Sequence, residues 1–170
     1  VGTCLDDKII DGYLATGKHE KFCRPFPENV NYHYFKDWKT VVEGSDFVIG
    51  GVSSFGVDWF LEEILIQLDP EMPVLSVTKG LRATDDGSLL SYPGYWMSEL
   101  AKRGIHRDIC AVGGPCTSYE LVFKDPTEVA FCGWDNEVLR MMKQAMQRPY
   151  YHISLPNDVI GLESAVALNN

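Results

Sequence analysis

Short apolar runs alternate along most of the chain with segments whose apolar residues recur at helical spacing. The runs 47–52, 74–77 and 109–112 are continuously or almost continuously apolar and short, which is typical of strands buried on both faces of a parallel sheet. Two further strands are predicted at 128–132 and 150–155. This alternation predicts an α/β fold built on a mainly parallel sheet.

Helices are predicted in the segments between these strands. Residues 58–68 and 92–102 carry apolar side chains at helical spacing, so each is expected to pack one face on the sheet. A helix over 135–147 begins at Asp135, because Asp is a preferred N-cap residue. The positions expected to form its buried stripe are Leu139, Met142 and Met146.

The first part of the chain has a less regular pattern. A helix is predicted from Leu5 onward, with its end at or near Gly17. Residues 18–31 mix charge, Pro and Asn and are expected to form a loop, and residues 32–35 are predicted as a short strand. Asp37 then caps a short helix.

Composition and charge exclude several classes of protein. With 170 residues, 45% of them apolar, the chain is long enough to bury one substantial core. Its formal charge is -9 and its 15 basic residues are scattered, which argues against a nucleic-acid partner. No apolar run approaches the roughly 20 residues of a membrane span, and no signal pattern opens the chain, so a cytoplasmic location is expected.

Cysteines and histidines give no sign of a metal site or a disulfide framework. The five cysteines are odd in number and include no C-x-x-C pair, and reduced thiols are the expectation. The four histidines are dispersed, with no neighbouring Cys or Ser pattern that resembles a triad or a ligand set. We therefore expect no metal.

Three segments follow predicted core strands directly and are the places where chemistry is expected, because ligands of open α/β sheets bind at the carboxyl ends of strands. In one of them, Lys79 precedes Gly80, so its ammonium would project over the sheet edge and attract a phosphate or an alkoxide. A solvated turn lysine, a plain tight turn and a simple strand end are the alternatives that spacing alone leaves open. The three segments are Ser53-Ser54-Phe55, Thr78-Lys79-Gly80 and Gly113-Gly114-Pro115-Cys116.

A last helix is predicted from residue 156 to the end of the chain. Glu163, Val166 and Asn170 share one of its faces, since they are three and seven residues apart. Glu163 on that face is either buried with a partner or exposed at its edge.

Taken together, four motifs resemble the NAD(P)-dependent glycerol-3-phosphate dehydrogenase family, in the family's order and over essentially the whole chain. The most specific is the last, in which Asp-Val-x-Gly-Val-Glu through Ala-Leu-Lys-Asn resembles residues 158–170. The others are the strand-end Lys-Gly of 77–81, the Gly-Pro-(Ser/Thr)-x-Ala-x-Glu element at 114–120, and Pro-Thr-x-Val at 126–129.

The resemblance implies a Rossmann-like, doubly wound sheet over residues 1–155, and the first helix of an all-α substrate domain over 156–170. It implies hydride transfer between NAD or NADP and glycerol 3-phosphate or dihydroxyacetone phosphate. Lys79 would contact both substrate and cofactor, and Asn170 would bind substrate. The positions that would line the nicotinamide side are Ser53, Phe55, Gly114 and Ser118.

Several residues depart from the family's pattern. Its general acid/base is the lysine of Ala-Leu-Lys-Asn, and Asn169 occupies that position here. An amide can hydrogen-bond a hydroxyl but cannot exchange a proton near neutral pH as a lysine with a lowered pKa can. Cys116, Ser118 and Ser53 also replace the usual residues. Two alternatives therefore stand beside the dehydrogenase: a paralogue acting on another hydroxy acid or polyol phosphate, and a non-catalytic dinucleotide-binding protein.

The resemblance also places parts of the family's fold outside this sequence. The first strand and its Gly-x-Gly-x-x-Gly turn would precede Val1, and most of the helical substrate domain would follow Asn170; no such glycine motif occurs between them. The residue that distinguishes NAD from NADP would fall at or before Thr3-Cys4, so the cofactor is not decided. A homodimer is a further expectation, because the family is often dimeric.

Overall fold

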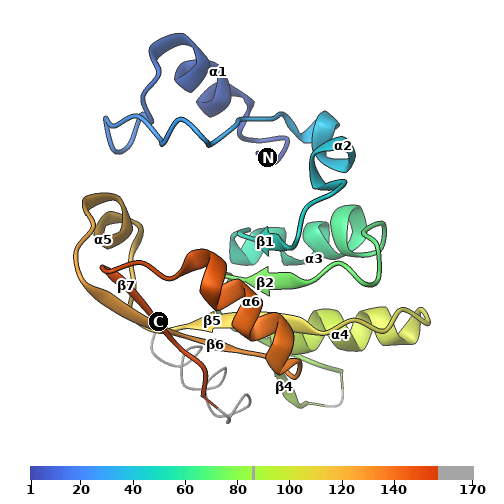
Figure 1. Ribbon diagram of the computed structural model, residues 1–170. Helices are drawn as coiled ribbons and strands as arrows, with labels where there is room; N and C mark the ends of the chain where they lie inside the picture. Colours follow the sequence, from blue (N-terminus) through green and yellow to red (C-terminus); the bar gives the residue numbers. More distant parts are fainter. Residues whose placement is uncertain (86, 157–170) are drawn as a thin grey trace. The chain divides into compact units, whose positions relative to one another are not determined.

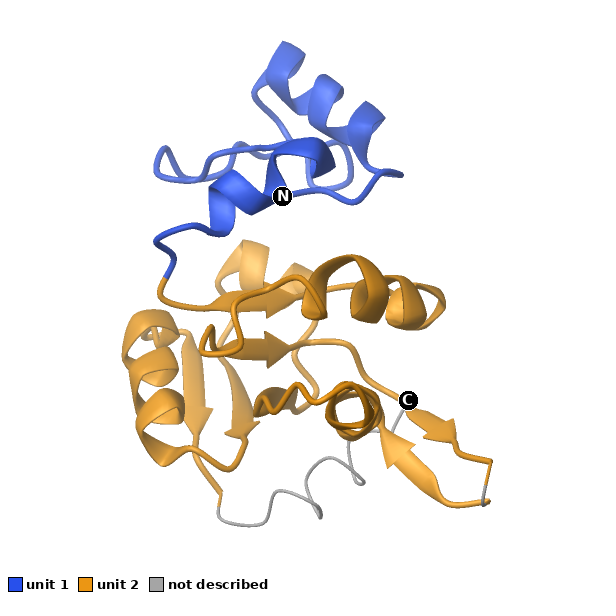
Figure 2. Cartoon of the chain, turned by 90° about the vertical axis from the view of Figure 1, so that its right-hand side faces the viewer, with its two compact units in different colours: residues 1–45 blue, residues 46–170 orange. Residues whose placement is uncertain are grey.

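The computed structural model describes residues 1–85 and 87–156. It divides into two compact units, Val1–Ser45 and Asp46–Asn170 (Figure 2). Each unit is described by itself below, with the element labels of Figure 1.

The first unit opens with the predicted helix, α1 (Asp7–Thr16). The helix ends as the sequence predicts, because Gly17 adopts the left-handed conformation and donates its backbone N–H to the Tyr13 carbonyl. A 3₁₀ turn, η1 (Phe35–Asp37), leads into the short helix α2 (Trp38–Val42). Asp37 stands at the N-cap of α2, but its side chain makes no capping hydrogen bond.

Residues 32–35 do not form the short strand predicted for them. Tyr32 instead stacks its ring on that of Tyr13 in α1, with centroids 3.9 Å apart, and Tyr34 donates its hydroxyl to Asp11 Oδ1 at 2.6 Å. The segment is extended because it lies along α1, and its aromatic side chains cover the helix. Aromatic residues in this pattern are compatible with a segment that packs on a helix as well as with a strand. The prediction of a strand at 32–35 is therefore wrong.

The second unit contains a five-stranded sheet in the order β1-β2-β5-β6-β7. Neighbouring strands are parallel except for β5 and β6, which are antiparallel. The mainly parallel α/β sheet is thus confirmed, with one reversal of direction. The strands are β1 (Val48–Gly50), β2 (Val74–Ser76), β5 (Ile109–Gly113), β6 (Thr127–Cys132) and β7 (Tyr151–Ser154).

Helical segments connect these strands, and most of them occupy predicted positions. The helix predicted at 58–68 is part of a continuous helical run over 54–65. This run consists of a 3₁₀ turn, one α-helical turn and a π-helical stretch, in that order. A small hairpin and the helix α5 were not predicted. The helical segments are η2 (Ser54–Gly56), α3 (Val57–Phe60), η3 (Leu61–Leu65), α4 (Tyr92–Lys102), α5 (Ser118–Phe123) and α6 (Asn136–Met146), and the hairpin consists of β3 (Leu81–Ala83) and β4 (Leu89–Ser91).

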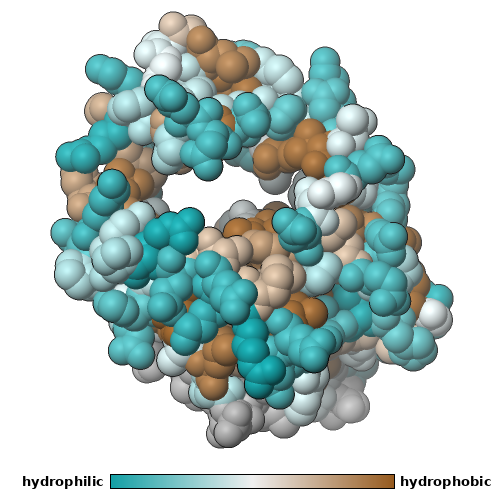
Figure 3. Space-filling model, in the orientation of Figure 1, coloured by the Kyte–Doolittle hydropathy of each residue, from teal (hydrophilic) through white to brown (hydrophobic). Residues whose placement is uncertain are grey.

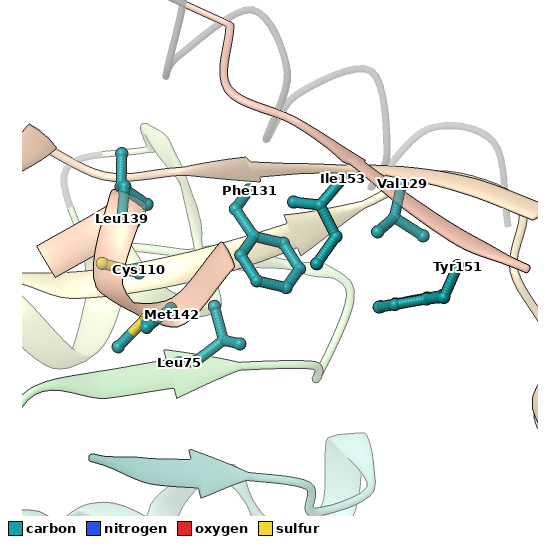
Figure 4. Packing of buried hydrophobic residues seen from close by; sticks show 8 residues of the cluster. All are labelled: Leu75, Cys110, Val129, Phe131, Leu139, Met142, Tyr151 and Ile153. Carbon is teal, nitrogen blue, oxygen red and sulfur yellow. The ribbon is translucent and has the colours of Figure 1, made fainter. Parts of the chain in front are cut away.

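One face of the sheet is covered by α6. Asp135 caps this helix as predicted, its carboxylate accepting the backbone N–H groups of Glu137 and Val138. Leu139 and Met142 are buried against side chains from four strands, and Met146 packs at the border. Figure 4 shows this cluster, whose strand members are Leu75, Cys110, Val129, Phe131, Tyr151 and Ile153.

The opposite face packs on α3 and α4. Trp96 of α4 is fully buried, and its indole N–H donates to the Val57 carbonyl of α3 at 2.9 Å. Its ring lies 5.2 Å from that of Phe60, and Gly50 of β1 is so close that an added Cβ would lie 2.8 Å from the Phe60 ring. Helices on both faces make the sheet doubly wound, as the sequence predicts.

Arg107 is a buried cation that joins the start of β5 to the chain following η3. It is 8% exposed, and its guanidinium donates to the carbonyls of Met72, Leu68 and Asp69 at 2.9, 2.8 and 2.6 Å. Burial lowers the pKa of this arginine, although Asp69 and Glu71 oppose the shift. Arg107 thus ties three carbonyls of the segment after η3 to the start of β5.

Replacing Arg107 by Met is expected to lower the free energy of unfolding by about 2–4 kcal/mol, because the buried Leu68 carbonyl loses its guanidinium donor and two partly buried carbonyls lose one each. Urea unfolding followed by tryptophan fluorescence measures the change. Arg103→Met is the matched control, since Arg103 pairs with Glu62 at the surface and such pairs contribute about 0–1 kcal/mol. Equal effects of the two substitutions would contradict the structural role of Arg107.

Within residues 1–85 and 87–156, no helix is long and apolar enough to cross a membrane.

Candidate functional site

The ends of β1, β2 and β5 lie next to one another, because parallel strands that are neighbours finish at the same edge of a sheet. A hydrogen bond joins two of these ends: the Thr78 hydroxyl after β2 donates to the Val52 carbonyl after β1 at 2.7 Å. The segments predicted to carry chemistry are therefore brought to one edge by the topology.

Lys79 reaches across this edge to the turn after β5. Its Nζ donates to the Gly114 carbonyl at 2.6 Å, and the side chain is half-buried. Among the described residues, no carboxylate forms an ion pair with the Lys79 ammonium. A backbone carbonyl thus orients the ammonium at this edge of the sheet.

Two glycines permit this arrangement. Gly114 has φ +125°, and a Cβ there would lie 3.0 Å from the Glu128 carbonyl oxygen and 3.2 Å from Val129 Cα of β6. Gly80 has φ +142°, and a Cβ there would lie 2.5 Å from the Tyr92 ring. Both positions combine a backbone conformation that L residues avoid with a close neighbour.

Gly114→Ala is expected to destabilise the turn by about 1–3 kcal/mol and to displace the carbonyl that orients Lys79. The backbone of β6 cannot move away as a flexible side chain would, so the strain remains in the turn. Thermal unfolding measures the loss. Gly104→Ala provides the control, because Gly104 also has a positive φ, +75°, but an added Cβ meets nothing within 4 Å. A Gly114→Ala protein as stable as this control would show that the close approach to β6 is unimportant.

The hairpin that follows Gly80 is anchored to the helices beside it. Arg82 of β3 pairs with Asp58 of α3 at 2.9 Å, and Tyr95 of α4 donates its hydroxyl to the same carboxylate at 2.9 Å. These contacts hold the pKa of Asp58 below its usual value against the opposing, and individually larger, effect of desolvation. The sequence analysis missed this hairpin, which fixes the chain immediately after Lys79.

Cys116 lies in the segment after β5 and is partly buried against the core. Burial raises the pKa of its thiol; a hydrogen bond with Thr127 and the charge of Lys79 act in the opposite direction. A raised pKa favours the neutral thiol over the thiolate.

Ser118 is the first residue of α5, and its helix begins with a capping box. The Thr117 side chain accepts from the Glu120 N–H at 3.4 Å, and Glu120 accepts from the Thr117 N–H at 2.5 Å. These bonds lower the pKa of Glu120. Threonine followed three residues later by glutamate is a sequence signal for a helix start, and it would have located α5.

Phe55 lies in the turn η2 after β1, and Ser53 directly precedes this turn. Ser53 is exposed, and Phe55 is 97% exposed, so its ring presents an apolar face to any planar group that approaches the edge. An unshielded phenylalanine is unfavourable in water and gains from stacking. Asn169 and Asn170 lie outside the described residues, as does the helix predicted there. No cluster that could hold a metal ion is found in residues 1–85 and 87–156.

A doubly wound, mainly parallel sheet with helices on both faces defines a Rossmann-like domain. A model of the family described as "NAD-dependent glycerol-3-phosphate dehydrogenase N-terminus" matches residues 10–139. The chain belongs to this family, as its motifs indicate.

Curated relatives extend the match over nearly the whole chain. The NADP(+)-dependent glycerol-3-phosphate dehydrogenase of Archaeoglobus fulgidus is 26% identical over 169 residues, which are 99% of this chain and 49% of that protein. The chloroplastic glycerol-3-phosphate dehydrogenase [NAD(+)] of Oryza sativa subsp. japonica is 29% identical over 130 residues, 75% of this chain and 28% of that protein. This chain thus spans about half or less of these relatives.

Solved structures show the same fold. The glycerol-3-phosphate dehydrogenase of Plasmodium falciparum superposes with a TM-score of 0.78 at 21% identity, covering 94% of this chain and 43% of that one. The enzyme of Coxiella burnetii gives 0.76 at 19% identity, covering 94% and 46%. At these identities, the likeness supports the Rossmann-like fold and nothing finer.

Proposed function

We propose that the protein carrying this chain is an oxidoreductase that transfers a hydride between NAD or NADP and glycerol 3-phosphate, interconverting it with dihydroxyacetone phosphate. The observation that carries the proposal is the Lys79 ammonium, fixed over the carboxyl edge by the Gly114 carbonyl at 2.6 Å in a chain of this family. A fixed cation there suits the oxygen of a small phosphorylated substrate.

The residues at the edge are suited to a nicotinamide cofactor, which when bound supplies the hydride-transfer chemistry. We assign Phe55 and Ser53 to one side of it, and Gly114 and Ser118 to the other. The Phe55 ring is open to stacking, and the absence of a side chain at Gly114 allows close approach to the backbone. Lys79 would contact both the cofactor and the substrate, and Asn170 the substrate.

Asn169 supports a second candidate function. It stands where the family has its proton-exchanging lysine, and an amide cannot take over that role. Either another group moves the proton, as in a paralogue acting on a different hydroxy acid or polyol phosphate, or the protein binds the dinucleotide without catalysis.

The test is the absorbance of the reduced nicotinamide, with full-length protein carrying this chain, dihydroxyacetone phosphate, and NADH or NADPH. Turnover with one cofactor is expected and would exclude the non-catalytic function. Binding of the cofactor without turnover of this substrate or of other polyol phosphates would contradict the dehydrogenase. The same assay, run with NADH and with NADPH, decides which of the two cofactors the protein uses.

We further propose that residues 1–155 contribute to the cofactor-binding domain and that 156–170 begin the helical substrate domain. A cytoplasmic homodimer is the assembly we expect, on the family resemblance alone. Light scattering of the full-length protein measures the assembly.

A further inference from the structure

A hollow of about 720 Å³ lies beside α6 and the edge strand β7, and cationic side chains line it. Arg140 and Lys143 of α6, Arg148 of the following turn and His152 of β7 face it, together with Gln144 and Gln147. No acidic residue of the stretch 1–85 or 87–156 lines it. Its size is that of a pocket for a small molecule.

The cations belong to one structural feature. Arg140 and Lys143 are three residues apart and lie together along one side of the stripe of Leu139 and Met142, which are buried against the sheet. The turn that carries Arg148 is closed by backbone hydrogen bonds in both directions between Arg148 and Tyr151, at 3.0 and 3.1 Å. The two sides of the hollow are thus each held by regular structure. Figure 3 shows hydrophilic side chains gathered over the outward face of α6.

These charges are not neutralised within the described part of the chain. Residues 1–85 and 87–156 contain no ion pair of Arg140, Lys143 or Arg148, and the Arg148 guanidinium donates to the Gln147 carbonyl at 2.6 Å. The negative end of the helix accounts for Lys143 and Arg148 but acts only over the last turn, and Arg140 lies outside it. In a chain of formal charge -9, this concentration of cations needs another explanation.

We propose that this hollow binds the phosphate group of a small molecule, at a site separate from Lys79. Guanidinium groups bind phosphate oxygens in pairs, lysine adds a point charge, and the two glutamine amides supply neutral donors. A small ligand is favoured over a nucleic acid, because the hollow is concave and the net negative charge of the chain repels an extended polyanion. The site lies two strands along the sheet from β5, and it does not depend on the proposed dehydrogenase activity.

The test is calorimetric titration of the full-length protein with inorganic pyrophosphate at low salt. Saturable binding is expected for the unmodified protein. The double variant Arg140→Gln/Lys143→Gln is expected to bind at least about tenfold more weakly, since two charge-assisted hydrogen bonds contribute more than the 1.4 kcal/mol of a tenfold change. Lys8→Gln/Lys39→Gln makes the same change of net charge at exposed positions of the first unit and should bind within about twofold of the unmodified protein.

Three results would overturn the proposal. One is the absence of saturable pyrophosphate binding. Another is equal weakening by the two double variants, which would reveal a response to net charge alone. The third is binding that Lys79→Met abolishes and Arg140→Gln/Lys143→Gln leaves intact, because the pyrophosphate would then occupy the carboxyl edge. Citrate serves as the comparison anion, and weaker binding of citrate than of pyrophosphate is expected.

Discussion

Under the proposed function, replacing Lys79 by Met is expected to lower kcat/KM for dihydroxyacetone phosphate by about 10²–10³-fold, the usual cost of removing one fixed electrostatic group from an active site. Methionine keeps the length of the aliphatic chain but removes the ammonium that the Gly114 carbonyl orients at 2.6 Å. Initial rates of reduced nicotinamide oxidation, measured over a range of substrate concentrations, give kcat and KM separately.

Lys8→Met is the matched control for this substitution. Lys8 is exposed on α1, so its replacement removes the same charge without touching the sheet edge. Its kcat/KM should remain within about twofold of the unmodified protein. If Lys79→Met keeps a similar rate while its fold is intact, then Lys79 is not part of the catalytic machinery.

Asn169→Lys is expected to raise kcat by about 10²–10⁴-fold, the range that general acid/base help contributes. A lysine at this position restores a group that can exchange a proton, where the amide cannot. The gain should appear mainly in kcat and should change the pH dependence of kcat, because the new group exchanges a proton.

Asn169→Met is the control that separates the loss of the amide from the gain of a group that exchanges a proton. It removes the amide without adding a proton donor, so any gain that it shares with Asn169→Lys comes from something other than proton transfer. An unchanged rate with lysine would mean that residue 169 does not occupy the family's acid/base position in this protein.

The sequence contained enough information to place the strands and the main helices. The short, continuously apolar run 109–112 predicted a core strand and forms β5, and Asp135 marked the start of α6 directly. The direction of β6 was not accessible in this way, because an apolar run is equally compatible with parallel and antiparallel pairing. Residues 32–35 were predicted wrongly because aromatic side chains that cover a helix have the same pattern as a strand.

The location of the candidate site could be predicted from the sequence, but most of the contacts within it could not. The rule that ligands bind at carboxyl ends selected Lys79, Gly114 and Ser53, and the topology confirms that their segments share an edge. Contacts between residues distant in sequence were not predictable, such as the Thr78 hydroxyl bound to the Val52 carbonyl or the Arg82–Asp58 pair. Their formation depends on how two segments pack, which no local pattern records.

The bond between Lys79 and Gly114 has a consequence for the thermodynamics of ligand binding. An ammonium has three N–H donors, and the Gly114 carbonyl takes one of them, so two stay available to oxygens of a ligand. The loss of rotamer freedom, about 0.5–1.5 kcal/mol for such a side chain, is thus incurred when the protein folds and not when the ligand arrives. A ligand that meets a preorganised lysine keeps that amount as affinity.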